Sequence, residues 1–152
     1  IAYIKCTLMK TIFSLLIISG IMTACSSSQN NNASRQLTLE GTHWKLIELN
    51  GQPVTAEDVS REAFIQLIAE SGRVTGNGGC NVMSGTYEVS SPNRIKFSQM
   101  AATKMACLKM DVEDRFHNAL ETTDSYYLKG DTLQLIRARM APLAIFIAGE
   151  KK

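Results

Sequence analysis

Beyond residue 36, short apolar runs alternate with turn signals along the chain. In the first run, Trp44 and Leu46 fall on one face of an extended strand, and Leu49 returns to that face after a shift of phase. Turn-forming segments such as "NGQP" (50–53) and "SSPN" (90–93) separate the runs. We therefore expect Trp44 in the core. The pattern predicts eight strands, at residues 42–49, 63–69, 73–76, 84–89, 94–98, 125–129, 132–137 and 143–148.

One segment has helical rather than strand periodicity, and it predicts an α-helix over about residues 111–123. Asp111 is a suitable N-cap, and Glu113 and Asp114 suit the positive end of a helix. The apolar residues of its buried face are Val112, Phe116, Ala119 and Leu120.

Most of the predicted strands are short and follow one another through tight turns, which favours antiparallel pairing. We expect a mainly β fold of the α+β type. It would be a cracked, barrel-like antiparallel sheet of about eight strands, with the single helix covering the open end.

The start of the chain has the features of a secretory signal. We expect translation to start at Met9, and a charged residue and an apolar run follow it, so residues 1–24 comprise upstream residues and a signal peptide. The sequence "MTAC" (22–25) resembles a bacterial lipobox, although Met22 stands where leucine is preferred. That resemblance implies cleavage before Cys25 and its lipidation, and two or three acyl chains anchor a protein durably. Ser26, rather than aspartate, suggests the outer membrane, facing the periplasm.

Residues 25–36 contain the acylated cysteine and a polar segment that cannot form a core, so we expect a flexible tether there. Residues 37–152 are then one small domain. Of the 16 basic residues, Lys5 and Lys10 leave with the signal, so 14 basic residues balance 14 acidic ones. This balance gives no basic stripe for nucleic acid, and we expect no nucleic-acid partner.

The segment "RVTGNGGCNVMSGTY" (73–87) raises three chemical possibilities besides a structural one. Its glycines do not fit a nucleotide-binding motif, because Asn81 stands where the third glycine of G-x-G-x-x-G belongs. Cys80 could be a nucleophile with His43 or His117 as its base, but no helix follows it to lower its pKa. "MACLKM" (105–110) brings two methionines and Cys107 close together, which are ligand types for Cu(I).

A disulfide is the interpretation that the cysteine count favours. Cleavage removes Cys6 and acylation uses Cys25, which leaves Cys80 and Cys107 as an even pair in an oxidising compartment. A bridge that encloses 27 residues would stabilise the fold by about 3.5 kcal/mol in the chain-entropy model. We therefore expect no catalytic residues, no metal and no cofactor.

Several motifs, in order, resemble the META domain, the HslJ-like family. They are "WKL" (44–46), "GRVTGNGGCN" (72–81), "GTY" (85–87), "TKMAC" (103–107) and "LQL" (133–135). The resemblance implies a small β fold with one helix, a Cys80–Cys107 bridge, and exported proteins linked to heat-shock or stress response without an established reaction. It supports an architectural role for the Gly-Cys-Asn loop, in which an exposed Asn77 or Asn81 could still contact a partner.

These features predict a non-enzymatic, monomeric envelope lipoprotein with a binding or support role under envelope or heat-shock stress. Its partners would be the membrane, through the lipid anchor, and an envelope protein or lipid. One alternative is a hydrophobic-ligand-binding pilot or assembly factor for an outer-membrane complex, because a barrel of about eight strands can enclose one small ligand. A second alternative is a periplasmic inhibitor of a cell-wall lytic enzyme.

Overall fold

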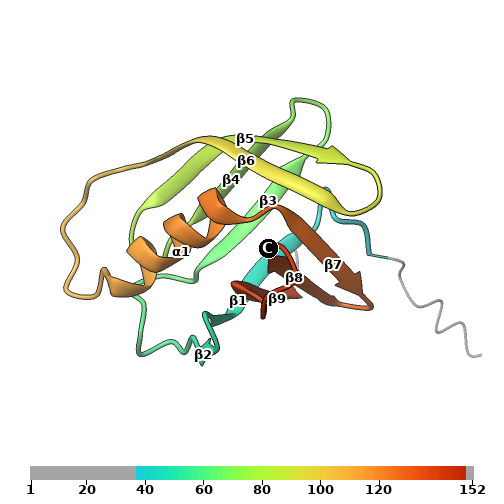
Figure 1. Cartoon of the computed structure of the whole chain (residues 1–152). Helices are drawn as coiled ribbons and strands as arrows, with labels where there is room; N and C mark the ends of the chain where they lie inside the picture. Colours follow the sequence, from blue (N-terminus) through green and yellow to red (C-terminus); the bar gives the residue numbers. More distant parts are fainter. Residues whose placement is uncertain (1–36, 150–152) are drawn as a thin grey trace, which may run out of the picture. The chain divides into compact units, whose positions relative to one another are not determined.

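The computed structural model describes residues 37–149 (Figure 1), so the predicted signal, Cys25 and the tether lie outside the described residues. Within this range there are nine strands and one helix. They are β1 (His43–Leu49), β2 (Gln52–Pro53), β3 (Phe64–Ile68), β4 (Arg73–Asn77), β5 (Val82–Ser90), β6 (Arg94–Ala102), α1 (Asp111–Thr122), β7 (Ser125–Lys129), β8 (Thr132–Ile136) and β9 (Ala144–Ala148).

The strands form one antiparallel sheet in the order β2-β1-β3-β4-β5-β6-β7-β8-β9. A further pairing between β1 and β9 closes eight of these strands into a barrel, and β2 is an additional short strand on β1. The prediction of a mainly β, antiparallel, barrel-like sheet of about eight strands with one helix is therefore confirmed.

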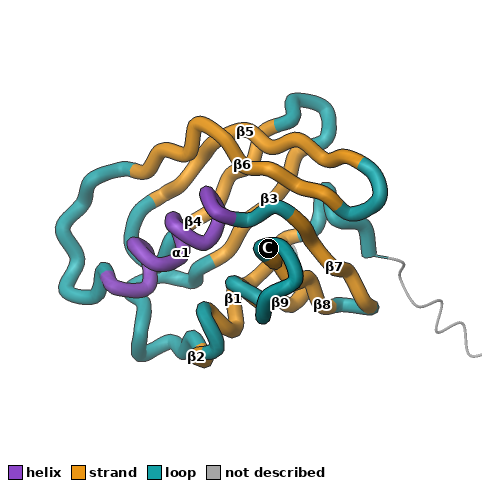
Figure 2. Tube along the Cα trace, viewed as in Figure 1, coloured by secondary structure: helices purple, strands orange, loops and turns teal. Residues whose placement is uncertain are grey.

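The barrel is weakest between β6 and β7, which share a single registered pair, Arg94 with Ser125. The chain that joins these two strands contains α1, which packs against β6 and β1 (Figure 2). The helix thus covers the end of the barrel where the two strands diverge.

Large apolar side chains fill the barrel. Trp44 is fully buried, and its indole N–H donates to the Leu39 carbonyl at 2.8 Å, which satisfies the one polar atom of that side chain. The other large side chains of this core are Leu46, Leu49, Ile65, Leu67, Met83, Ile95, Phe116, Leu120, Leu133, Leu135 and Phe146. An enclosed hydrophobic ligand, as the pilot hypothesis requires, would need the space that these side chains occupy.

Two local predictions were wrong. The N-cap of α1 is Met110, not Asp111, and no side chain caps the helix. Asp111 lies inside the first turn and pairs with Arg115 at 2.8 Å, one helical turn away. In addition, β6 continues to Ala102, beyond the predicted end at residue 98. Gln99 adopts a φ of 53°, and the register with β5 shifts next to it, so the strand contains a bulge. Such a bulge interrupts the alternation on which the sequence prediction depended.

Candidate functional site

The glycine-rich segment includes β4, the start of β5 and the loop 78–81 that joins them, at the end of the barrel that α1 covers. Its glycines are required by close approaches rather than by a bound phosphate. A Cβ on Gly78 would lie 2.6 Å from Cγ of Glu113, and a Cβ on Gly79, whose φ is 112°, would lie 2.8 Å from Cγ1 of Val59. The loop is therefore packed on one side against α1 and on the other against the segment before β3.

Asn81 is the centre of a buried hydrogen-bond cluster. Its backbone N–H and its side-chain amide donate to the two carboxylate oxygens of Glu113, at 2.7 and 2.8 Å. Its side-chain oxygen accepts from the Thr103 hydroxyl at 2.8 Å and from the Met105 N–H at 2.7 Å. One asparagine thus joins the start of β5, the first turn of α1 and the 103–110 loop. We call Asn81, Thr103, Met105 and Glu113 the Asn81 cluster.

The disulfide adds a covalent link to the same place. Cys80 is bonded to Cys107, with their Cα atoms 6.3 Å apart. While this bond is intact, Cys80 has no thiolate for the nucleophile hypothesis and Cys107 has none for the copper hypothesis. Each of the two proposed bases has a carboxylate neighbour instead, since His43 bonds to Glu62 at 2.9 Å and His117 lies 3.7 Å from Glu121.

The expectation that Asn77 and Asn81 are exposed for partner contact was wrong. Asn77 is 6% exposed and Asn81 is fully buried. The Asn77 side-chain oxygen accepts from the Gly79 N–H at 2.8 Å. Both asparagines use their amides to fix the loop, because buried polar groups require hydrogen-bond partners.

A hollow of about 730 Å³ lies beside the Asn81 cluster, between the end of β6, the 103–110 loop and α1. We call it the methionine groove. Its lining contains Met100, Met105, Met110 and His117, together with neighbouring alanines and the acidic residues Glu113 and Asp114. The sequence grouped Met105 with Met110 as possible copper ligands, but it did not associate Met100 or His117 with them. The spacing of Met110, Asp114 and His117 on one helix face was the signal that could have added His117.

The loop beside this groove presents an apolar tip. Leu108 is completely exposed, and 46% of Met105 is exposed. In Figure 1 this loop projects beyond α1 at the edge of the domain. An exposed leucine is ordinary by itself, but this one lies next to a disulfide and three residues from the Asn81 hydrogen bonds.

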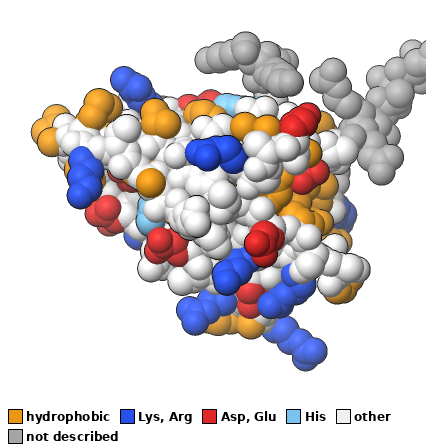
Figure 3. All heavy atoms as spheres, turned by 90° about the horizontal axis from the view of Figure 1, so that it is seen from above, with side chains coloured by type: hydrophobic (Ala, Val, Ile, Leu, Met, Phe, Trp, Pro, Cys, Tyr) orange, Lys and Arg blue, Asp and Glu red, His pale blue; other side chains and the backbone are white. Residues whose placement is uncertain are grey.

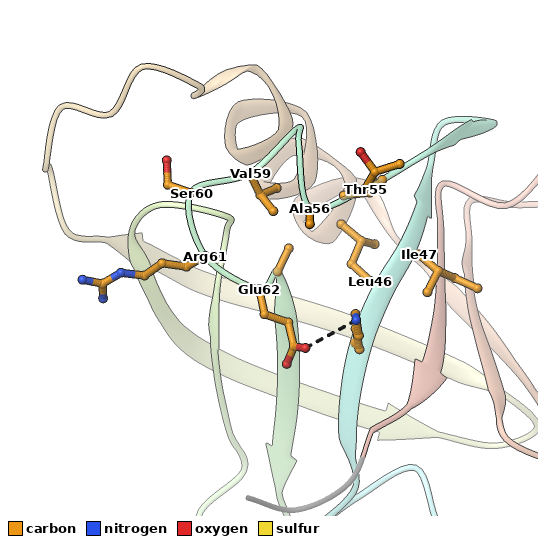
Figure 4. A pocket seen from close by; sticks show the side chains of 11 residues that line it. Leu46, Ile47, Thr55, Ala56, Val59, Ser60, Arg61 and Glu62 are labelled. Atoms are coloured by element: carbon orange, nitrogen blue, oxygen red, sulfur yellow. Dashed lines mark ion pairs between the residues drawn. The ribbon is translucent and has the colours of Figure 1, made fainter.

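A second hollow, of about 450 Å³, lies where β1 and β3 separate. In Figure 4, Leu46, Ala56 and Val59 face its interior, whereas Arg61 extends away from it. Glu62 bonds to His43 and pairs with Lys45 at 3.6 Å, and the His43 bond lowers the pKa of its carboxyl below the usual 4.5. Glu62 and Lys45 thus pair with each other, and Arg61, the other charged residue of the lining, extends away from the hollow.

The described surface has a mixed character. Acidic and basic side chains are interspersed on the face in Figure 3, with hydrophobic side chains among them. Across residues 37–149, no helix has the length and apolar character needed to cross a membrane. In the same residues, no three histidine, cysteine, aspartate or glutamate side chains gather as metal ligands.

Comparisons with known proteins address the family and the fold. The META domain profile matches residues 36–150. An NMR structure of a protein from Burkholderia xenovorans has a TM-score of 0.59 and 22% identity, covering 74% of this chain and 85% of that one. A crystal structure of a DUF4847 family protein from Bacteroides vulgatus has a TM-score of 0.55 and 16% identity, covering 75% and 96%.

At these identities the likeness to the solved structures is one of fold, and no curated protein matches the chain. The family profile covers most of the chain, including every strand and the helix. The chain therefore belongs to the META domain family, as the motifs around Cys80 and Cys107 predict.

Proposed function

We propose that this META domain is a non-enzymatic envelope lipoprotein that acts by binding an apolar surface of another envelope protein. The observation that carries this proposal is the exposed tip of the 103–110 loop, where the apolar side chain of Leu108 is completely exposed. A support role under envelope stress is the context that the family resemblance suggests.

The tip of the loop is held in place by the disulfide and by hydrogen bonds. The Cys80–Cys107 disulfide fixes the chain on one side of Leu108. The Asn81 side chain fixes Met105, because it accepts from the Met105 N–H at 2.7 Å and donates to the Met105 carbonyl at 3.1 Å. A loop that is already ordered loses little conformational entropy when it binds. Binding residues are commonly found on loops that a rigid scaffold positions.

The compartment is supported by two independent features. A disulfide in a small domain suits an oxidising, exported location. The lipobox-like segment that ends at Cys25 supplies the means of attachment to the membrane.

The binding surface can be tested by photo-crosslinking in cells, with the full chain and Cys25 intact. A photoreactive amino acid at position 108 should give a discrete adduct with one envelope protein. Met140, which is 65% exposed on a different loop, is the matched control and should not give that adduct. The adduct should weaken in a Cys80→Ala/Cys107→Ala variant, because the loop is then less ordered. Equal labelling from both positions would contradict the proposal.

The anchor is tested separately by the intact mass of the protein extracted from membranes. A mass that begins at acylated Cys25 and gains two hydrogens on reduction is expected. A Cys25→Ser variant should move to the soluble fraction. An unacylated mass would refute the lipoprotein assignment and leave the crosslinking test of the tip unaffected.

A further inference from the structure

We propose that the methionine groove binds a soft monovalent cation, Cu(I). The ligands would be the thioether sulfurs of Met100, Met105 and Met110 and the imidazole of His117, all of which line this one hollow. This inference is independent of the partner that the loop tip binds.

The donor types select the metal. Thioethers favour Cu(I), and imidazole is a good additional ligand for copper. Harder cations find fewer ligands here, because both oxygens of Glu113 are occupied by Asn81. The other carboxylate of the groove lining is Asp114, which does not bond to Asn81. The sequence alone grouped Met105 and Met110 with Cys107, and the structure replaces that bridged cysteine by Met100 and His117.

Three elements bring the ligands to the groove. Met100 comes from the end of β6, and Met105 from the loop that Asn81 holds. Met110 is the N-cap of α1, and His117 lies seven residues further on, two turns along the same face. A methionine side chain has three rotatable bonds, so its sulfur can move toward a shared ion while its backbone stays fixed.

The charges around the groove also favour a cation. Glu113 is buried and accepts two hydrogen bonds from Asn81, and among residues 37–149 no lysine, arginine or histidine forms an ion pair with it. Asp114 adds a second acidic group, and Lys104 is the one basic residue among those that line the groove besides His117. The Nδ1 atom of His117 lies 3.7 Å from Glu121, an arrangement that leaves Nε2 for the ion.

Silver(I) provides a redox-inert probe of this site. The full mature chain, with its disulfide intact, is labelled with ¹³C at the methionine methyl groups and titrated with Ag(I) while NMR spectra are recorded. The signals of Met100, Met105 and Met110 should shift together and saturate at one equivalent. Met140, exposed and away from the groove, is the internal control and should not move.

Cu(I) affinity is then measured by competition with a chromogenic chelator, with ascorbate as the reductant because it leaves the disulfide intact. Met105→Leu and His117→Phe should each weaken binding by at least about tenfold, since even the loss of an outer-shell partner costs 10- to 100-fold. Met140→Leu should have no effect. Leucine conserves the volume of methionine, and unchanged thermal unfolding would show that the variants are folded.

Two results would overturn the proposal. One is a titration in which Met140 shifts as much as the groove methionines, or in which nothing saturates. The other is an unchanged Cu(I) affinity in both Met105→Leu and His117→Phe. If Met105→Leu does not fold, Met110→Leu replaces it in the same comparison.

Discussion

Trp44 and Asn81 are both fully buried, yet they lie in regions that are held together by opposite means. Around Trp44, apolar side chains from many strands fill the barrel, and their attraction is non-directional. Around Asn81, directed hydrogen bonds and one disulfide connect segments that lie 22 to 32 residues apart in the sequence. The first region stabilises the domain by apolar packing, and the second adds to that stability while it gives one loop a defined position.

The difference has an energetic consequence. A change in the apolar core costs free energy roughly in proportion to the volume removed. A change in the Asn81 cluster can leave a buried acceptor without its donor, which costs more than the bond itself contributed. The comparison can therefore be tested by variants in each region, beginning with the largest expected effect.

Trp44→Ala should lower the free energy of unfolding by about 3–5 kcal/mol, because it removes the largest side chain of the core and leaves a cavity. Urea unfolding measures this loss. Tyr127→Ala is the control, since Tyr127 is half exposed on β7 and its truncation should have a much smaller effect. A loss below about 1 kcal/mol for Trp44→Ala would show that the barrel interior is not the main source of stability.

Removal of the disulfide should cost nearly as much, about 3.5 kcal/mol for a 27-residue separation. The Cys80→Ala/Cys107→Ala variant and the reduced wild type should unfold at similar urea concentrations. Added reductant should shift the wild-type midpoint and leave the variant unchanged. If reductant also shifts the variant, the loss of stability has a source other than this bond.

Most of the barrel could be predicted from sequence, because one buried face produces an alternating pattern. The strands ending at Lys129 and Ile136 were placed within one residue in this way. The strand β2 was not predicted, since Gln52 and Pro53 are both exposed and pair only with the end of β1. The extension of β6 was also not predicted, because the bulge at Gln99 breaks the alternation.

The cysteine pair was predictable from counting, but the Asn81 cluster was not. Asn81 lies in a glycine-rich loop, a context in which polar residues are usually exposed, and its partner Glu113 is 32 residues away. Glu113 also had a sufficient local explanation, as an acidic residue in the first turn of a helix. Nothing local in the chain shows that both residues are buried against each other.

The Asn81 cluster can be examined by a double-mutant cycle. Asn81→Ala should cost about 2–3 kcal/mol, because the buried Glu113 carboxylate loses the side-chain amide donor while it keeps the backbone N–H of residue 81. The Thr103 hydroxyl and the Met105 N–H also lose their acceptor. Asn81→Ala in a Glu113→Ala background should cost distinctly less, so the two effects should not add. Asn118→Ala, on the exposed face of α1, is the control. Additive losses would mean that the contact between Asn81 and Glu113 is not energetically coupled.

The smallest expected effect concerns the edge of the apolar core, at Tyr87. This side chain is buried, and its hydroxyl donates to the Glu40 carboxylate. Burial, and then the bond to Glu40, raise the pKa of Tyr87 well above its ordinary value of 10.0. The folded state therefore favours the neutral phenol, whereas the unfolded chain loses this proton near pH 10. The stability from this difference is fully present below pH 10 and is lost as the pH rises above it.

Tyr87→Phe should consequently lower stability by about 1 kcal/mol at neutral pH, the contribution of one hydrogen bond. Above pH 10 the stability of the variant should fall less steeply than that of the wild type, so the two should converge. Urea midpoints measured between pH 7 and pH 11 give both quantities, and the difference between the two proteins removes the common effect of the other tyrosines and lysines. Parallel curves over this range would show that Tyr87 ionises equally in the folded and unfolded states. The boundary of the apolar core would then be open to water at this position.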